Sequence, residues 1–148
     1  MRRVVGGDLE IAVWMKQHLP LLELSTPYTA IGVTDSDNRL VGAVLYDNFV
    51  KFNIHTHIVL TSPSAMTPMF LGEAFRYPFE QLKCPRITAL VSAQNQRSKR
   101  LCKRLGFKLE GICREAYPDG SDLYIFGMLK RECRWLNLRR PHVQRLCA

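Results

Sequence analysis

The stretch SAQNQRSKRLCKRLGFKLEG, residues 92–111, joins an apolar run to a basic segment and then to a second apolar run. Asn95 follows the first run, and its side chain can accept a hydrogen bond from an amide of a first helical turn. Apolar residues then recur at the spacing of one helix face, and Gly106 supplies the left-handed residue with which many helices end. The stretch therefore predicts a buried strand, a helix over 96–105 and a second strand.

Packing does not explain two features of this helix. Ser98 places a hydroxyl on the face that otherwise carries Leu101, Cys102 and Leu105. Six basic side chains lie between Arg97 and Lys108, and several of them fall in the first turn, where the helix dipole disfavours cations. An anionic group beside the helix would accept a hydrogen bond from the Ser98 hydroxyl and offset the positive charge of the first turn.

Strands and helices alternate along the rest of the chain. Periodicity and turn residues predict strands over 4–5, 28–34, 40–46, 52–61, 86–92, 107–117 and 122–132, and helices over 8–19, 67–82 and 96–105. Asp8 is expected to cap the first helix, and Thr67 followed by Pro68 to begin the second. The order β-α-β-β-β-α-β-α-β-β predicts an α/β (α+β) fold with a mixed sheet flanked by helices.

Composition limits the class of protein. The 148 residues favour a single domain, expected over 1–136 and followed by a basic tail over 137–148. No apolar run is long enough to cross a membrane, and no secretory signal is expected. The five cysteines form no Cys-x-x-Cys pair, which indicates free thiols in a reducing cytoplasm and no metal site. The net charge of +8 favours an anionic partner: nucleic acid, an acidic protein or a phosphate-bearing cofactor.

The motifs around this helix resemble those of a known family. They are Asn95-x-x-Ser98 and Leu105-Gly106-Phe107-x-x-Glu110-Gly111-x-x-Arg114. They are similar to motifs of the GNAT family of N-acetyltransferases, above all the branch of ribosomal-protein N-terminal acetyltransferases and its small phage or prophage members. The resemblance is strongest over 75–136. It implies a sheet of about six to seven strands, in which the strand bearing His55 and His57 splays from the strand over 86–92 and acetyl-CoA lies in the gap.

The resemblance also implies which residues hold acetyl-CoA. The pantetheine arm would pair with the open strand edge, and the phosphates would lie on the following turn and the basic helix. The implied cofactor-binding residues are Ile58, Val59, Leu60, Ser62, Ser64, Ala65, Met66, Thr67, Asn95, Ser98, Lys99 and Arg100. One departure concerns the pyrophosphate loop, where Pro63 and Ala65 stand at the family's small-residue positions and proline has no amide to donate. Hydroxyls of Ser62, Ser64 and Thr67 are expected to compensate.

Two residues are predicted to carry the chemistry, each with a structural alternative. Many members of the family use a tyrosine as the acid that protonates the leaving thiolate, and Cys102 stands at that position, although a cysteine on an apolar stripe is commonly a core residue. His57 titrates near neutrality and is the predicted base, unless it is a structural histidine. Asp47 is a weaker alternative base, and Tyr124 either lines the acceptor pocket or packs in the sheet. His55 and His57 lack a third ligand for a metal ion.

Three functions follow from these features. The first is an acetyl-CoA-dependent N-acetyltransferase, in which the amine of a protein N-terminus, a lysine or a small molecule attacks directly in a ternary complex. The second is a non-catalytic protein of the same fold that binds CoA or a partner. The third, the weakest, is a nucleic-acid-binding module that uses the basic residues over 97–108 together with Arg139, Arg140 and Arg145. The protein is expected in the cytoplasm, as a monomer or homodimer and without a membrane partner.

Overall fold

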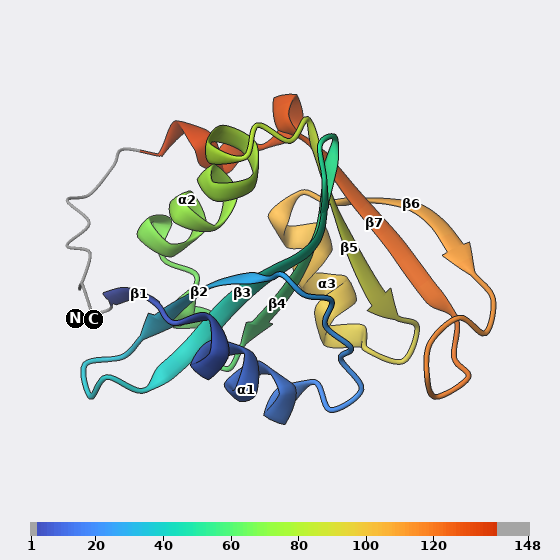
Figure 1. Cartoon of the computed structure of the whole chain (residues 1–148), viewed down its shortest axis with the longest axis horizontal. Coiled ribbons are helices and arrows are strands. Elements are labelled where there is room, and N and C mark those ends of the chain that lie inside the picture. The colour runs from blue at the N-terminus through green and yellow to red at the C-terminus, as the bar shows by residue number, and fades with distance from the viewer. Residues whose placement is uncertain (1–2, 139–148) are drawn as a thin grey trace.

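The computed structural model describes residues 3–138, and within this range seven strands form one mixed sheet in the order β1-β2-β3-β4-β5-β7-β6 (Figure 1). The strands are β1 (Arg3–Gly6), β2 (Thr29–Thr34), β3 (Leu40–Val50), β4 (Asn53–Leu60), β5 (Arg86–Ser92), β6 (Lys108–Cys113) and β7 (Leu123–Leu129). The helices are α1 (Asp8–His18), α2 (Pro68–Arg76) and α3 (Gln96–Leu105). The predicted order of elements is therefore confirmed. No helix within residues 3–138 is long and apolar enough to cross a membrane.

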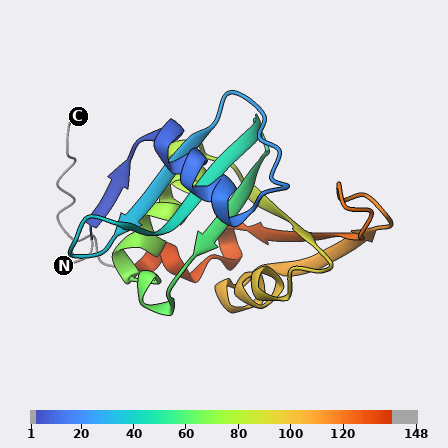
Figure 2. The same cartoon turned by 90° about the horizontal axis from the view of Figure 1, so that it is seen from below.

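Helices cover both faces of the sheet (Figure 2). On one face α1 packs Ile11, Ala12 and Met15 against β2, β3 and β4 in a small apolar cluster. On the other face α2 and α3 pack against a larger cluster that reaches from β2 to β7. Side chains alternate across β4, so that Ile54 and Leu60 join the larger cluster and Val59 joins the smaller one.

The two strands β4 and β5 run parallel and diverge, which confirms the predicted splayed pair. Their register contains the single pair His55 and Thr88, whereas β4 stays paired with β3 up to Leu60 and β5 with β7 up to Ser92. Figure 1 shows α3 in the angle between the two strands. The open half of β4 therefore has one edge without a neighbouring strand.

A polar network holds the closed end of this angle. Asn53 Oδ1 at the start of β4 accepts hydrogen bonds from Thr88 Oγ1 at 2.7 Å and from Arg86 Nε at 3.3 Å. The same guanidinium forms an ion pair with Glu110 on β6, with 2.6 Å between Nη2 and Oε1. This ion pair crosses β7 at Gly127, where a Cβ atom would lie 2.1 Å from Glu110 Oε1. The absent side chain thus lets β4, β5 and β6 be linked across β7.

Helix α3 begins and ends as the sequence predicts. Asn95 Oδ1 accepts the amide of Ser98 at 3.0 Å, and Gly106 has a left-handed φ of 103°. Two side chains from later in the sequence also cap the C-terminal end of α3. Trp135 Nε1 donates to the carbonyl of Leu105 at 2.9 Å, and Arg134 donates to the carbonyl of Arg104. These contacts satisfy two carbonyls of the last turn and place a cation at the negative end of the helix dipole.

One expectation about helix ends is wrong, and a second holds in part. The N-cap of α1 is Gly7, whose φ of 138° suits glycine, whereas Asp8 is the first helical residue and accepts the amide of Ala30 on β2 at 2.8 Å. The second helix continues to about Leu82 and is irregular at Pro78, as proline predicts, but its last part is not an α-helix. It changes at Tyr77 into one π-helical turn, Tyr77–Gln81, because Pro78 has no amide to donate. The predicted basic tail lies outside the described residues from 139 onward.

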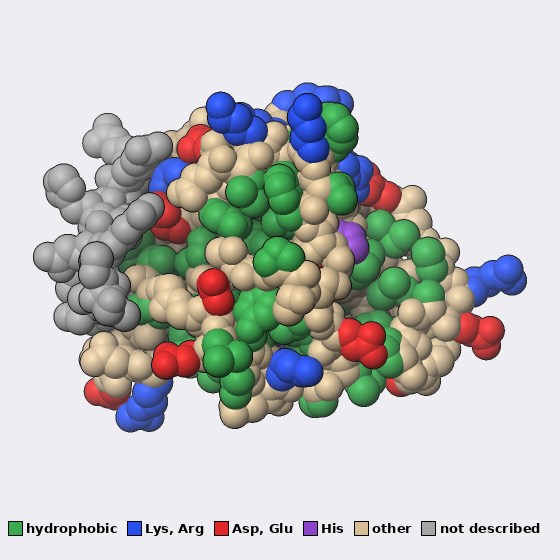
Figure 3. All heavy atoms as spheres, viewed as in Figure 1, with side chains coloured by type: hydrophobic (Ala, Val, Ile, Leu, Met, Phe, Trp, Pro, Cys, Tyr) green, Lys and Arg blue, Asp and Glu red, His purple; other side chains and the backbone are tan. Residues whose placement is uncertain are grey.

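Charged and apolar side chains are distributed unevenly over the surface. On the face drawn in Figure 3, hydrophobic side chains gather over the middle, and Lys and Arg side chains lie mostly toward the outline. Three of the exposed large hydrophobic residues, Phe49, Val50 and Phe52, lie where β3 turns into β4. The positive net charge therefore does not form a uniform coat over the molecule.

Candidate active site

A cleft of about 240 Å³ opens where β4 and β5 diverge. Thr56, His57 and Ile58 form its β4 wall, residues 89–92 form its β5 wall, and α3 contributes Asn95, Ser98 and Cys102. A middle hollow of about 130 Å³ shares Leu19, Ile58, Asn95, Ser98 and Leu101 with the cleft and adds His18, Val59, Leu60 and Arg97. A third hollow of about 190 Å³ shares Leu60, Arg97 and Leu101 with the middle one. The three form a continuous channel along the open edge of β4.

The open edge of β4 offers backbone groups to this channel. The carbonyl of Leu60 points away from β3, because it accepts a hydrogen bond from Arg97 Nη2 at 2.6 Å. Backbone groups alternate along an antiparallel strand, so those of Ile58 point to the same side. An extended ligand with amides could therefore pair with Ile58 and Leu60 as an added strand would.

The third hollow is lined by three arginines, and we call it the arginine hollow. Arg97, Arg100 and Arg104 line it together with Leu60, Pro63, Met66 and Leu101. Their spacing of three and four residues places them on one face of α3. Lys99, predicted to bind the cofactor, lies instead with Nζ 4.4 Å from the centre of the Tyr124 ring. The sequence prediction omitted Arg104, although its spacing from Arg97 and Arg100 could have revealed it.

The turn predicted to hold the pyrophosphate is a short 3₁₀ helix, Pro63–Ala65. Its amides donate within the turn: Ser64 to Ser62 Oγ, Ala65 to the Ser62 carbonyl, Met66 to the Pro63 carbonyl and Thr67 to the Ala65 carbonyl. Thr67 Oγ1 caps α2 by accepting the amide of Phe70 at 3.1 Å. The hydroxyls of Ser62 and Ser64 lie 2.7 Å apart beside the arginine hollow. In this conformation, the guanidinium groups that line the arginine hollow are better placed for an anion than the amides of the turn.

His57 lies in the cleft wall with a buried carboxylate behind it. Its Nε2 is 2.8 Å from Asp47 Oδ1, and the two side chains are 10% and 1% exposed. The other oxygen of Asp47 accepts the amide of Ser25 at 3.0 Å. Burial alone would raise the pKa of Asp47, but the hydrogen bond and charge of His57 and the Ser25 amide outweigh it, so the pKa is lowered. An ionised carboxylate only accepts hydrogen bonds, so Nε2 carries a proton and Nδ1 is the ring nitrogen that can receive one.

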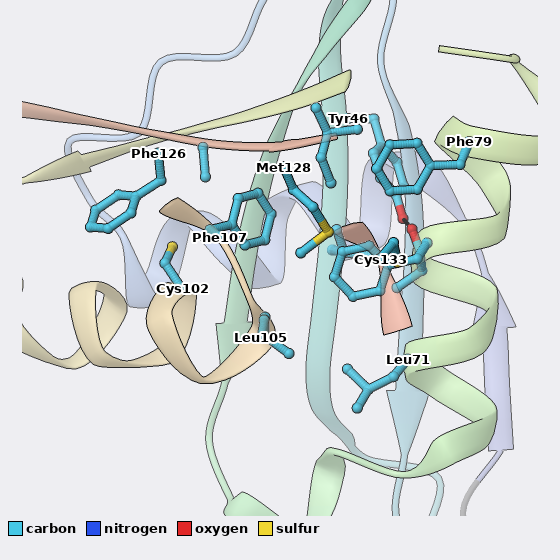
Figure 4. Close-up of a cluster of buried hydrophobic side chains, with 14 of the residues drawn as sticks. Tyr46, Leu71, Phe79, Cys102, Leu105, Phe107, Phe126, Met128 and Cys133 are labelled. Atoms are coloured by element: carbon cyan, nitrogen blue, oxygen red, sulfur yellow. Dashed lines mark hydrogen bonds between the residues drawn. The ribbon is translucent and has the colours of Figure 1, made fainter. Parts of the chain in front are cut away.

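Cys102 is a core residue, 5% exposed, that also lines the cleft, and its predicted role as an acid stays a prediction. Figure 4 shows its sulfur pointing from α3 toward Phe126 and Phe107. Burial raises the pKa of the thiol to about 12. At neutral pH it is therefore a protonated hydrogen-bond donor and not a thiolate.

Tyr117 is a cleft residue that the sequence prediction missed. It lies in the loop between β6 and β7 and lines the cleft beside Ala116 and Pro118. Hydrogen bonds attach this loop to the end of β5, because Ser121 Oγ lies 2.9 Å from Ser92 Oγ and the amide of Ala93 donates to the carbonyl of Asp122. Burial, followed by the charge of Asp119, raises the pKa of the Tyr117 hydroxyl. The hydroxyl is thus a neutral hydrogen-bond donor. The position of Tyr117 depends on contacts of its loop, which the hydrophobic periodicity of the sequence does not predict.

Two further residues weighed from the sequence have structural surroundings. Tyr124 packs against Phe126 and under Lys99, outside the set that lines the cleft. His55 lies 3.3 Å from the side-chain nitrogen of Asn48, ring Nδ1 to Nδ2. Within residues 3–138, no three His, Cys, Asp or Glu side chains gather in a way that could hold a metal ion.

No protein-family model and no curated protein sequence matches the chain. Solved structures do match. One is the spermidine/spermine N-acetyltransferase SpeG from Vibrio cholerae in glutamate-to-glutamine mutant forms, with 14% identity over 93% of this chain and 98% of that chain and a TM-score of 0.70. A dodecameric structure of spermidine N-acetyltransferase from Vibrio cholerae has 15% identity over 92% and 96% and a TM-score of 0.67. A proposed acetyltransferase from T. thermophilus has 24% identity over 73% and 62% and a TM-score of 0.59. At these identities the likeness shows the fold, which is that of the GNAT-like acetyltransferases.

Proposed function

We propose that this chain, which has the fold of the GNAT-like acetyltransferases, is an acetyl-CoA-dependent N-acetyltransferase acting on an amine. The observation that carries the proposal is the channel between β4 and β5, whose middle offers open strand edge and whose end is lined by three arginines. Acetyl-CoA has amides along its middle and phosphates at one end, and it supplies an activated acetyl thioester. The order of groups in the ligand therefore matches the order of groups in the channel.

Two kinds of residue would hold this ligand. Backbone groups of Ile58 and Leu60 would pair with the amides, and Arg97, Arg100 and Arg104 would bind the phosphates by charge-assisted hydrogen bonds. Arg97 now donates to the Leu60 carbonyl. In the complex we expect its guanidinium to turn to a phosphate and release that carbonyl to an amide of the ligand. Asn95 and Ser98 line both the cleft and the middle hollow and are the predicted contacts at the thioester end.

His57 is the proposed base. Its Nδ1 would take a proton from the incoming ammonium group, directly or through one water, so that the neutral amine attacks the acetyl carbonyl. Asp47 would keep the imidazole in this tautomer and stabilise the imidazolium that forms. The arrangement is the positioning of a histidine by a buried carboxylate that serves other acyl-transfer enzymes.

Cys102 and Tyr117 are the candidate partners of the departing sulfur. A thiol with a pKa of about 12 is a weaker acid than an ordinary thiol, whose pKa is about 8.5. Cys102 is therefore suited to donate a hydrogen bond to the sulfur and less suited to give its proton away. Tyr117 reaches the same cleft with a hydroxyl from the opposite loop.

The histidine pair on β4 gives the sharpest test of the proposed activity. His57→Asn should lower kcat for acetyl transfer about 100-fold or more, the usual range for loss of a general base, and leave the Kd for acetyl-CoA unchanged. The matched control is His55→Asn, two residues away on the same face, which should stay within a few-fold of wild type. Release of CoA and the mass of the acetylated amine are the readouts. Equal kcat in both variants would rule out His57 as the base.

One observation favours the non-catalytic alternative. The amides of the turn over 64–67 are donated within the turn, and Pro63 stands at one of the family's small-residue positions, where it has no amide to donate. A protein that binds CoA without transfer would bind acetyl-CoA in the titration and acetylate no amine. The kinetic assay above therefore separates the two functions.

A further inference from the structure

The end of the cleft away from the arginine hollow lies between two loops. Residues 21–23 come from the loop between α1 and β2, and residues 116–118 come from the loop between β6 and β7. None of these residues lines the arginine hollow. If the channel holds acetyl-CoA as proposed above, this end is the side from which the amine approaches.

The walls of this end are mostly apolar. The apolar lining residues contributed by the loops and by the start of β7 are Leu21, Leu22, Ala116, Pro118 and Leu123. Leu21 is 46% exposed although Leu22 beside it is 8% exposed, so Leu21 presents side-chain surface that the fold itself does not bury. An apolar group bound here would cover that surface and gain free energy in proportion to the area removed from water.

Negative charge is scarce at this end. Among the described residues that line the cleft, Glu23 is the only carboxylate, and it is exposed. Asp47 is 1% exposed, and its two oxygens already accept from His57 and from the Ser25 amide. The whole chain carries a net charge of +8, which repels cations. Asp119, whose charge helps to raise the pKa of Tyr117, lies outside the cleft lining. A ligand with several ammonium groups would have to place all but one of them without a carboxylate of the cleft wall, and removing an unpaired charge from water is costly.

We propose that the acceptor is a primary amine with a single positive charge on an apolar group, and not a polyamine. The inference rests on the proposed function. Glu23 would attract the one ammonium group at the mouth, and the leucines would hold the apolar group while the amine reaches His57. A small apolar amine and the first residue of a polypeptide that begins with leucine share this chemistry. The proposal thus separates this chain from the polyamine substrates in the names of its structural neighbours.

The first experiment compares acceptors that differ in charge alone. Hexylamine and hexamethylenediamine have the same carbon chain but carry one and two ammonium groups. With saturating acetyl-CoA, kcat/KM for hexylamine should exceed that for the diamine, and that for spermidine, by about tenfold or more, because the second charge finds no carboxylate. A peptide beginning with leucine is assayed beside them. Acetylation of the peptide in preference to hexylamine assigns the apolar group to a polypeptide, and the reverse order assigns it to a small molecule.

Matched variants locate the effect. Leu21→Ser should raise KM for hexylamine about fivefold through lost apolar contact, with the Kd for acetyl-CoA unchanged. Leu9→Ser is the control, since Leu9 is a leucine on α1 that is 69% exposed and does not line the cleft. Glu23→Gln should raise KM for hexylamine about threefold, as loss of an exposed ion pair does. Glu115→Gln, the same change at an exposed residue outside the cleft lining, should leave KM unchanged.

The outcomes separate the two proposals. If acetyl-CoA binds and spermidine or the diamine is the better acceptor, the inference about the amine is wrong and the acetyltransferase stands. If acetyl-CoA binds and neither hexylamine nor the leucine peptide is acetylated, the inference about the amine is also wrong. The acetyltransferase then stands only if spermidine or the diamine is acetylated. If acetyl-CoA does not bind, the proposed function fails and the inference falls with it.

Discussion

At the scale of single residues, burial and hydrogen bonds together shift the pKa values of groups in the cleft wall and behind it. Asp47 is kept ionised by His57 and the Ser25 amide, whereas burial keeps Cys102 and Tyr117 protonated. The cleft therefore has an acceptor of protons on the β4 wall and donors on the α3 and loop walls. This division suits a reaction that removes a proton from an amine and delivers one to a sulfur.

Substitution of the two donors identifies which one matters. Tyr117→Phe removes a hydroxyl and keeps the ring, and Cys102→Ala removes the thiol from the apolar cluster. If Tyr117 protonates the sulfur, Tyr117→Phe should lower kcat about 100-fold. In that case Cys102→Ala should change kcat less than fivefold and lower the free energy of unfolding by about 1 kcal/mol through the lost packing. The reverse pattern of kcat would assign the role to Cys102, as the sequence resemblance predicts.

The structural roles that could be predicted from the sequence belong to residues whose hydrogen-bond partners lie close by in the chain. Asn95 and Gly106 could be assigned because the partners of a helix cap lie within four residues. The hydrogen bond between His57 and Asp47 depends on the register of β3 and β4, and the place of Tyr117 depends on contacts between its loop and β5. Neither register nor loop packing can be read from one sequence. The predicted binding roles of residues 58–67, 95 and 98–100 stay predictions.

At the scale of elements, the closed end of the β4–β5 angle is what positions the site. Asn53, Arg86, Thr88 and Glu110 tie three strands together there, and the strands separate beyond His55 and Thr88. The strands and helices themselves were predictable from period and turn residues. The splay was expected from the family resemblance and not from the period of either strand, because both strands read simply as buried runs.

Two glycines allow a test of this polar clamp. Gly127→Ala places a methyl group 2.1 Å from Glu110 Oε1 and 2.7 Å from Arg86 Nη2, so the ion pair must shift. The clashing atoms are the ends of flexible and partly exposed side chains, so we expect the free energy of unfolding to fall by about 0.5–1 kcal/mol, as for loss of an exposed ion pair. Gly111→Ala on β6, where nothing lies within 4 Å of the new methyl group, is the control. Urea denaturation measures both, and equal stability of the two variants would show that the clamp adapts without cost.

At the scale of the whole molecule, stability should fall on acidification. Burial, the largest effect, lowers the pKa of His55, although Asp47 opposes the shift, and the pKa of Asp47 is also lowered in the fold. A group with a lowered folded-state pKa stabilises the fold above its unfolded pKa, and this stabilisation is lost as the pH falls through the folded value. Stability should therefore begin to fall below pH about 6.5 because of His55, and again below about 4 because of Asp47.

Urea titrations between pH 8 and pH 3, taken about one unit apart, measure this dependence. His55→Asn should remove the first loss and keep the second, because asparagine does not titrate. A wild-type stability that rises from pH 7 to pH 5 would contradict the assignment.

The channel from the arginine hollow to the apolar mouth is the feature that unites fold and function, and binding of acetyl-CoA tests it most directly. Calorimetric titration should give a Kd between about 1 µM and 1 mM, the range in which enzymes commonly bind substrates. Arg100→Gln should weaken binding about fivefold by removing a charge-assisted hydrogen bond to phosphate. Lys103→Gln, the same loss of charge on α3 outside the arginine hollow, should have little effect. S-acetylpantetheine, which lacks the adenosine phosphates, should bind more weakly and equally to wild type and Arg100→Gln. Absence of acetyl-CoA binding at millimolar concentration, or equal weakening by both substitutions, would contradict the account.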